Sequence, residues 1–531
     1  GYGYLLYSNP QQYGAILYSA FLMPDAPYFK DMFQEGVLKH TSMTAYLPLV
    51  GIVGGLAFCR GRRSHPFTYI LKACIVCAFV PVLNSAFYAL NSSYYARWYY
   101  MPVLVLCGAT AYVLGRPHLA GRQVPRAWRL TALITLSAAA FALVPNADED
   151  GNFKLGVVDL QPRFWGIFGV SMLGVLLFWL LWRTARNRKE WPQIMLAGIL
   201  AFSFLYGSVH MSLTKYPQWK TDSDLIAQTY DWVAEIEQPL PRDTFYRIDA
   251  YGAHNNLGLW FDRSCLQVFN STVAPSIMEF YPSVGVTRDV NSKPSVQNDG
   301  LRGLLSVRYM LVARDSADDW NGENLTGWTP CGETSAYLLY RNDNWVPMGF
   351  TYDYYITEDQ FGSVPEEERA RVLMRAVLLD EDQIERLDGL LQPLPTEELA
   401  DRGDGRYATD CGDRRAAAAA DFTATRTGFT AHTAYDQEEL VFFSVPYDDG
   451  FTATVNGQPA AIEKVDHGLM AVRVPAGAAE IVFTYHTPGL ALSAGISLAG
   501  LAAYAVYIML LYRRRKRKTE WQIMLNNWPQ N

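Results

Sequence analysis

Motifs of several familiar catalytic classes are absent from this sequence. It has no glycine-rich loop that would cradle a phosphate, no Walker signature, no HExxH zinc motif and no serine nucleophile elbow. These absences argue against an ATP-driven pump and against a membrane protease. Charge is also scarce over long stretches: charged residues are sparse through the first 210 positions, and none occurs between residues 490 and 512.

Cysteine is scarce, with seven residues in a chain of 531. Three of them fall in the charge-rich stretch between the apolar ends, so at most one pair can form a disulfide there. Cys331 with Cys411 is a conceivable pair, which cysteine arithmetic leaves open. The other four lie in apolar runs, where a thiol behaves as a small hydrophobic side chain: Cys59, Cys74, Cys77 and Cys107.

The composition conceals two populations of residues. Half of all residues are hydrophobic and 14% are aromatic, yet the stretch 212–489 has the composition of an ordinary soluble protein. The net charge of -7 arises mostly in that stretch, since the basic residues cluster at the ends of apolar runs. No nucleic-acid partner is indicated, and a lipid bilayer is the expected surrounding of the apolar runs.

Seven apolar segments reach or approach the length of about 20 residues that a helix needs to cross the hydrocarbon core of a bilayer. We therefore predict a multi-pass α-helical membrane protein, with six transmembrane helices in residues 41–211 and a last one at 490–512. The seven segments are 41–59, 67–90, 100–115, 129–146, 163–182, 192–211 and 490–512.

Basic clusters predict the orientation, because Lys and Arg are retained on the cytoplasmic side. Such clusters follow the first, third, fifth and last segments, whereas the opposite connections hold few basic residues. Residues 1–40 then form an extracytoplasmic or interfacial segment, and residues 513–531 form a basic cytoplasmic tail. The clusters lie at 60–63, 116–129, 183–189 and 513–518.

The stretch 212–489 is predicted to be extracytoplasmic, and its first part, 212–415, to be a mixed α/β region. Residues 364–400 have a helical pattern within it. Asn255-Asn256 and Asn270-Ser271-Thr272 could read sugar hydroxyls, although turn formation explains most such clusters. The β-type runs, which alternate with turns, are 244–248, 307–312 and 336–340.

Residues 416–489 predict a compact antiparallel β-sandwich directly before the last transmembrane helix. Asn456-Gly457 stands between two β-type runs and indicates a hairpin, because both residues accept the positive φ of a type I′ turn. Such a domain could bind glycans or serve as a structural cap, and the fold alone does not decide between them. The β-type runs are 440–445, 451–455, 469–474 and 480–485.

The most unusual stretch is NSSYYARWYY, residues 91–100, at the outer end between the second and third expected helices. An interfacial aromatic belt explains its Tyr and Trp residues. Arg97 favours a second interpretation, because a guanidinium offers a planar fork of donors that matches phosphate oxygens. The candidates for substrate binding are Asn91, Tyr94, Tyr95, Arg97 and Trp98.

Other polar residues near the outer face give weaker candidates. Asp25, Asp31 and Glu35 lie in the segment before residue 41, and a carboxylate at that level could act as a general base. Three acidic residues in forty is ordinary, however. His210 ends the sixth expected helix, where a hydrogen-bonded interface residue is the simpler explanation.

A series of short segments also occurs in a distinctive order along the chain. These segments are Asn91–Tyr100, Phe245–Ile248, Asn255-Asn256, Phe269–Thr272, Glu279–Tyr281, Leu304–Tyr309, Val445–Asp448, Val455–Gly457 and Phe483–Leu490. Together they resemble the YfhO family of bacterial membrane proteins. The resemblance extends over essentially the whole chain, and the ordered series is far more specific than any one motif.

Members of that family resemble GT-C glycosyltransferases, multi-pass enzymes that take a sugar from an undecaprenyl-phosphate carrier and attach it outside the cell, in some cases to teichoic acids. The resemblance implies a GT-C-like bundle in the bacterial plasma membrane, with a polyprenyl-phosphate-linked sugar and a cell-envelope glycopolymer acceptor as partners. It also implies an acidic general base on the first outer loop. Because neither a signal peptide nor a transmembrane run precedes residue 41, we expect that the chain lacks its natural beginning and that catalytic loop.

The implied reaction is attack of an acceptor hydroxyl on the anomeric carbon with inversion, while a carboxylate removes the proton. The departing lipid phosphate needs positive charge more than it needs a proton. Arg97 is the candidate for that charge, with Tyr94, Tyr95 and Trp98 lining the sugar or prenyl path. A divalent metal could share the task, and the sequence leaves that open.

Two other functions compete with sugar transfer. A non-catalytic envelope protein that binds glycan or a partner enzyme is the main alternative, and an acidic residue in the first outer loop of the full-length protein would favour the enzyme over it. A transporter is a third possibility. It would favour inverted repeats and charged or broken helices at mid-membrane, which the sequence does not show.

The orientation gives a direct prediction. A single reactive cysteine introduced between residues 212 and 489 should be labelled by a membrane-impermeant maleimide in intact cells, because this stretch is expected outside. A matched cysteine in the tail 513–531 should react only after the inner compartment is opened. The reverse pattern would contradict the orientation and the functional expectation together.

Overall fold

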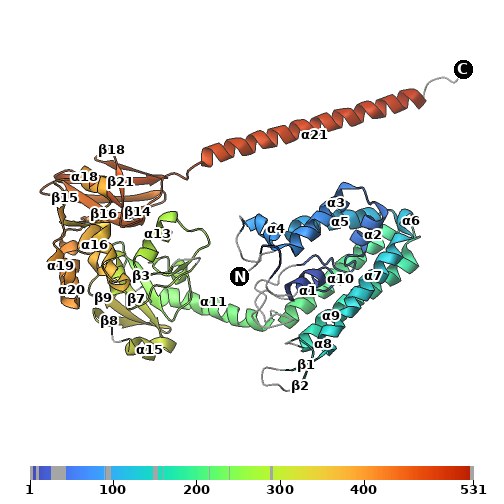
Figure 1. Ribbon diagram of the computed structural model, residues 1–531, viewed down its shortest axis with the longest axis horizontal. Coiled ribbons are helices and arrows are strands. Elements are labelled where there is room, and N and C mark those ends of the chain that lie inside the picture. The colour runs from blue at the N-terminus through green and yellow to red at the C-terminus, as the bar shows by residue number, and fades with distance from the viewer. Residues whose placement is uncertain are drawn as a thin grey trace. The chain divides into compact units, whose positions relative to one another are not determined.

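The computed structural model describes residues 4–7, 11–24, 44–88, 90, 97–147, 153–158, 161–214, 216–237, 239–287, 291–323 and 325–526. The chain divides into two compact units, Gly1–Leu225 and Ile226–Asn531, and α11 (Tyr216–Ile236) runs through the boundary between them. Figure 1 shows that helices dominate the first unit, which carries one short hairpin, and that the larger sheets lie in the second unit.

The first unit is mainly helical in its described residues, with one short hairpin. Its buried centre includes Phe58, Phe178, Trp182 and Trp191. The elements are α1 (Gln11–Tyr18), α2 (Val53–Gly61), α3 (Pro66–Phe79), α4 (Pro81–Ser85), η1 (Ala86–Tyr88), η2 (Arg97–Tyr99), α5 (Tyr100–Leu114), α6 (Pro117–Ala120), α7 (Gln123–Ser137), α8 (Ala139–Leu143), β1 (Pro145–Ala147), β2 (Phe153–Leu155), α9 (Gln161–Ala185) and α10 (Trp191–Thr214).

Three helices in the described part of the chain are long and apolar enough to cross a membrane: Gln161–Ala185, Trp191–Val209 and Leu490–Arg517. They coincide with three of the seven expected spans. The expected span 100–115 forms α5, which is apolar but has only 15 residues. The expected span 129–146 is divided between α7 and α8 and stops being helical at Leu143.

The first two expected spans are not the continuous helices that hydropathy predicts. Within 41–59 the backbone turns before α2, where Leu49 and Gly51 have φ of 64° and 53°. Within 67–90 the helix breaks at Pro81, because a proline has no N–H to donate and forces the residue before it into an extended conformation. A hydropathy profile measures the length of an apolar run, so it does not detect either break in the helices.

The second unit contains a five-stranded mixed sheet of order β4-β3-β7-β9-β8. β3 is parallel to β4 and β7, whereas β9 is antiparallel to β7 and β8. The strands are β3 (Arg247–Tyr251), β4 (Ser264–Cys265), β7 (Val307–Ala313), β8 (Trp328–Glu333) and β9 (Tyr337–Asn342). Neighbouring elements are α12 (Leu257–Trp260), β5 (Val268–Phe269), α13 (Pro275–Ser283), β6 (Asn291–Ser292), α14 (Asp299–Leu304), η3 (Arg314–Ser316) and α15 (Ala317–Gly322).

The helical prediction for residues 364–400 is correct only in part. This segment forms several short helices and two short strands, and Ala376–Leu378 is a strand, β12, parallel to β11. All three side chains of β12 are buried. The apolar run that resembles the apolar face of a helix in the sequence is therefore a strand that is buried on both faces. The elements are β11 (Tyr354–Ile356), α16 (Glu358–Gly362), η4 (Glu366–Glu368), α17 (Arg369–Val372), β12, α18 (Glu381–Arg386), β13 (Gln392–Pro393), α19 (Thr396–Ala400) and α20 (Asp404–Ala416).

The β-rich C-terminal region is confirmed, as two antiparallel sheets of order β10-β16-β20-β19 and β14-β15-β21-β17-β18. Side chains from both sheets share one buried cluster, in which Phe429 lies 5.0 Å from Phe443 and 4.4 Å from Phe483 between ring centroids. The strands are β10 (Phe350–Thr351), β14 (Asp421–Thr425), β15 (Gly428–Tyr435), β16 (Glu439–Pro446), β17 (Phe451–Val455), β18 (Gln458–Ala460), β19 (Ile462–Val465), β20 (Leu469–Val474) and β21 (Gly477–Tyr485).

The hairpin predicted at Asn456-Gly457 is confirmed. These two residues alone connect β17 to β18, and Val455 pairs with Gln458. Their φ angles are 51° and 74°, the positive values that a type I′ turn requires at both central positions.

Cys331 and Cys411 form no disulfide. Cys331 is exposed on β8, Cys411 is buried in α20, and both are free thiols. Burial raises the pKa of Cys411 to about 12, so this thiol stays neutral and unreactive at physiological pH.

The last helix, α21 (Leu490–Asn526), has 37 residues. Figure 1 shows it as one unbroken helix. Its most apolar window has no residue buried inside the protein. A side-chain surface of this kind is stable in lipid rather than in water.

The second unit also buries an acid, Asp466, in the turn between β19 and β20. One carboxyl oxygen accepts a 2.8 Å hydrogen bond from the backbone N–H of Leu378, and the other has no partner among the described residues. Burial raises the pKa of Asp466 from 3.8 to about 8. The folded state therefore holds a proton on Asp466 that the unfolded chain releases near neutral pH.

This acid predicts a pH-dependent stability. A raised folded-state pKa contributes stability that is complete below the ordinary Asp pKa and is lost as the pH rises through about 8. Asp466→Asn removes the titration, and Asn tolerates the φ of 51° at this position. The thermal unfolding midpoint of the second unit should therefore fall less between pH 5 and pH 9 in Asp466→Asn than in the wild type. Asp413→Asn, at an exposed position of α20, is the control and should leave the wild-type slope; equal slopes in all three proteins would refute the assignment.

Candidate functional site

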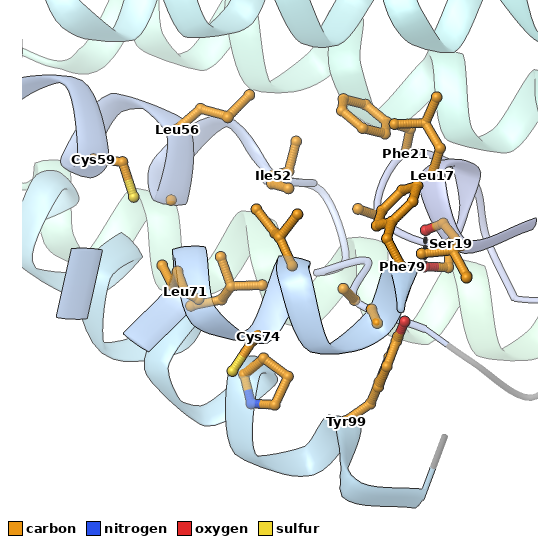
Figure 2. A pocket seen from close by; sticks show the side chains of 18 of the residues that line it. Leu17, Ser19, Phe21, Ile52, Leu56, Cys59, Leu71, Cys74, Phe79 and Tyr99 are labelled. Atoms are coloured by element: carbon orange, nitrogen blue, oxygen red, sulfur yellow. Dashed lines mark hydrogen bonds between the residues drawn. The ribbon is translucent and has the colours of Figure 1, made fainter. Parts of the chain in front are cut away.

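An apolar pocket of about 260 Å³ lies in the first unit. Figure 2 shows its labelled side chains converging from several helices on one space, with Leu71 and Cys74 on one side and Leu17 and Phe21 on another. Besides these, its wall includes Ile16, Ile52, Gly55, Leu56, Cys59, Ala78, Phe79, Trp98, Tyr99, Pro102 and Leu106.

The close approach of α2 and α5 forms one wall of the pocket. A Cβ added at Gly55 would lie 2.5 Å from Leu106 Cδ2, and one added at Gly54 would lie 2.5 Å from Thr110 Oγ1. Small residues allow helix backbones to approach in this way within a membrane, where packing rather than water exclusion drives association. The two adjacent glycines therefore fix the spacing of the helices that flank the pocket.

Trp98 is held firmly on the pocket wall. Its side chain is 4% exposed, and its indole Nε1–H donates a 2.8 Å hydrogen bond to Asn84 Oδ1. Its ring stacks on Phe87 with centroids 4.6 Å apart and meets Tyr99 edge-on at 4.9 Å. Because the N–H is satisfied inside the protein, the free face of the ring offers apolar surface to the pocket.

The other predicted substrate-binding residues are not described by the structure. Asn91, Tyr94 and Tyr95 lie outside the described residues, and Arg97 begins η2 with its side chain outside the described part. Arg97 is the residue directly before Trp98 in the sequence, and Trp98 lies on the pocket wall. A role for Arg97 remains a prediction.

The weaker candidates have a similar outcome. Asp25, Asp31 and Glu35 lie outside the described residues, as does the side chain of His210. Near His210 on the same helix, the ring of Tyr206 stacks on Tyr46 with centroids 6.3 Å apart.

The pocket is suited to binding an apolar chain and not to acid–base chemistry. No Asp, Glu, His, Lys or Arg occurs among its described lining residues. The hydroxyl of Ser19, one of the few polar groups there, already donates a 2.7 Å hydrogen bond to the carbonyl of Ile16. A ligand in this pocket would gain dispersion contacts and no hydrogen bond from Ser19 as a donor.

A metal centre is not found in the described part of the chain, where no group of three His, Cys, Asp or Glu side chains could hold an ion. Cys74 and Cys77 do have Cys-x-x-Cys spacing on α3, but both are free thiols in apolar surroundings.

The sequence singled out Trp98 as a candidate for substrate binding, a role that stays a prediction, and it did not indicate the pocket. Its walls come from segments far apart in the chain, such as Phe21, Leu71 and Leu106, each an ordinary apolar residue in an apolar run. The adjacent glycines in α2 are the one local signal, since they indicate a close helix contact.

Comparisons with known proteins agree with the resemblance of the ordered segments. A family model described as "Bacterial membrane protein YfhO" matches residues 25–387 and 412–497, which is most of the chain. "Uncharacterized protein YfhO" of Bacillus subtilis (strain 168) is 33% identical over 91 residues, which are 17% of this chain and 10% of that protein. The aligned part is thus a small share of the relative's length. No solved structure matches the chain.

The packing of Trp98 predicts a large cost of its removal. Trp98→Ala leaves a cavity beside Phe87 and removes the donor of the hydrogen bond that Asn84 accepts. The substitution should therefore destabilise the protein by about 3 kcal/mol. Trp98→Phe keeps the ring and loses the hydrogen bond, at about 1 kcal/mol. Thermal unfolding of the detergent-solubilised protein measures both, with Trp165→Ala at a 38% exposed position as the control. Equal losses for Trp98→Ala and Trp165→Ala would contradict the described packing.

Proposed function

Because this chain belongs to the YfhO family of bacterial membrane proteins, we propose that it transfers a sugar from a polyprenyl-phosphate carrier to a cell-envelope glycopolymer, such as a teichoic acid, on the outer face of the membrane. In this proposal the first unit forms a GT-C-like bundle. The second unit, with its C-terminal β-sandwich, lies outside the cell.

The observation that supports this proposal is the apolar pocket beside Trp98. Its volume of about 260 Å³ exceeds the roughly 150 Å³ of an engineered apolar cavity that admits benzene, so it has room for a branched hydrocarbon segment. Its apolar walls suit a prenyl chain and would not suit a sugar. The segment that enters the wall at Trp98 also carries Arg97, the group predicted to pair with phosphate.

In the proposed chemistry, different groups of the protein hold the apolar and the charged parts of the carrier. The prenyl chain would be held by apolar contacts, and the phosphate by charge at the end of the pocket. Arg97 would stabilise the negative charge that remains on the lipid phosphate when the glycosidic bond breaks. A divalent metal would supply the same charge if one binds. The proton of the acceptor hydroxyl would go to a carboxylate, which the resemblance assigns to the first outer loop of the family.

The orientation also belongs to this proposal. The cations at 513–518 directly follow the apolar part of α21, and such clusters remain on the cytoplasmic side. The residues before Leu490 then lie outside, where lipid-carried sugars are presented.

A non-catalytic role in glycan binding is the second candidate. It is favoured by a separate feature, a pocket in the second unit with Arg247, Asn270, Thr272 and Ser444 on its wall. One measurement distinguishes the two functions, because only sugar transfer predicts turnover of a lipid-linked sugar.

The first function predicts the effect of Arg97→Ala. Sugar transfer from a polyprenyl-phosphate donor, measured in membranes that contain the full-length protein, should fall at least about a hundredfold, the typical loss when a group that stabilises developing charge is removed. Arg126→Ala, at an exposed position of α7, should retain transfer and be inserted at the same level. If Arg97→Ala transferred sugar at the wild-type rate, Arg97 would not be part of the site.

A further inference from the structure

A second pocket, of about 380 Å³, lies within the second unit, where the mixed sheet meets the C-terminal sheets. Its wall includes Arg247, Asn270, Thr272, Tyr281, Ser444 and Pro446. These residues come from β3, the segment after β5, α13 and β16. Five of the segments that carry the family resemblance contribute to it, although they are far apart in the sequence.

Arg247 connects the two sheets at this pocket. Its Nη1 donates to the carbonyl of Leu305 at 2.7 Å and to Ser444 Oγ at 3.0 Å, and its Nη2 donates to the carbonyl of Ser444 at 2.9 Å. A guanidinium has five N–H donors, so the Nε–H and one Nη2 hydrogen have no oxygen partner among the described residues. No carboxylate in the described chain pairs with it either.

The charges around Arg247 do not neutralise it. Glu279 on α13 is paired with Lys464, and Asp249 on β3 is paired with Arg302 at 3.0 Å. Burial, with the Asp249 charge, raises the pKa of Cys265 to about 12, so this lining thiol is neutral. No Asp or Glu occurs among the described lining residues. The pocket therefore carries one uncompensated positive charge.

The Arg247 side chain is half-buried. Burial lowers the pKa of its guanidinium to about 10, which still leaves it protonated at neutral pH. Partial desolvation of a cation that no carboxylate pairs with is costly, and a bound anion would reduce that cost.

Polar groups and apolar surface lie beside the charge. The Asn270 side chain accepts a 3.1 Å hydrogen bond from the Thr272 backbone N–H, and both residues line the pocket. α13, nine residues long, begins at Pro275 directly after the lining residues Val273 and Ala274, so its positive dipole end adds to the field. Tyr281 and Pro446 contribute apolar surface to the wall of the pocket.

We propose that this pocket binds the phosphate of a sugar or polyol phosphate ester, with Arg247 on the phosphate and Asn270 and Thr272 near the hydroxyls. A neutral saccharide would leave the guanidinium unpaired, whereas a phosphate offers several oxygens to its two free donors. The ligand is either a free monoester or a phosphodiester within a polymer or lipid headgroup. The inference does not depend on sugar transfer, since it concerns binding by the second unit alone.

The test is a binding titration on the purified, detergent-solubilised chain. Glucose 1-phosphate represents the monoester and glycerophosphoglycerol represents the diester, with glucose and inorganic phosphate as comparison ligands. Thr272 is exposed at the rim, so Thr272→Asp adds a carboxylate beside the pocket without altering the core. Thr272→Asn is the matched neutral control. Arg247→Gln tests the charge itself, and the folding of each variant is checked by its unfolding midpoint.

We expect at least one phosphate ester to bind to the wild type and to Thr272→Asn, and to bind about tenfold or more weakly to Thr272→Asp and Arg247→Gln. Affinity should also fall as salt is added. The tighter of the two esters identifies the source. Three results would overturn the proposal: no phosphate ester binds, glucose binds as tightly as glucose 1-phosphate, or Thr272→Asp binds like Thr272→Asn. Inorganic phosphate that binds as tightly as the esters would overturn the assignment to a sugar or polyol.

Discussion

A charge that leaves water must find an opposite charge or a full set of hydrogen bonds, and this constraint organises both units. In the first unit, most described charged residues lie near the ends of the apolar helices, and Lys72, within α3, is exposed. In the second unit, guanidinium groups enter the core and are paired there. Arg302 meets Asp249 at 3.0 Å and Arg375 meets Asp410 at 2.8 Å, with every one of these side chains at most 4% exposed. Removing one partner of such a pair typically costs about 3–5 kcal/mol, so these pairs fix α14 and α20 against the sheets.

Arg247 is subject to the same constraint, but hydrogen bonds rather than an opposite charge hold it in place. Backbone carbonyls and the Ser444 hydroxyl take three of its donors, and no carboxylate takes its charge among the described residues. Carbonyls satisfy hydrogen bonds but do not neutralise a cation. The bonds explain why Arg247 is structurally fixed, and the remaining charge explains why the adjacent space favours an anion.

The sequence predicted those features that depend on local pattern. The strands of the C-terminal sheets alternate buried and exposed side chains or lie between clear turns, and Asn456-Gly457 specifies its hairpin chemically. The strand at Ala376–Leu378 was missed because burial on both faces removes the alternation that distinguishes a strand from a helix. Trp98 could be singled out as a candidate from its aromatic neighbours, but its place on a pocket wall could not be predicted. The uncompensated charge of Arg247 could not, because it depends on which carboxylates folding brings near, and the sequence shows only that Asp249 lies two residues away.

The two pockets differ in chemistry, and this difference bears on mechanism. The pocket beside Trp98 has apolar walls and no Asp, Glu, His, Lys or Arg among its described lining, so it suits an apolar chain better than it suits acid–base chemistry. In the proposed reaction, binding of the carrier and proton transfer would therefore be performed by separate groups. Contacts with the unreactive prenyl chain can then be used to position the phosphate against Arg97 and the anomeric carbon against the acceptor. A substitution deep in the apolar pocket would accordingly alter the rate of transfer as well as the affinity for the carrier, because the chain it holds determines where the reacting atoms lie.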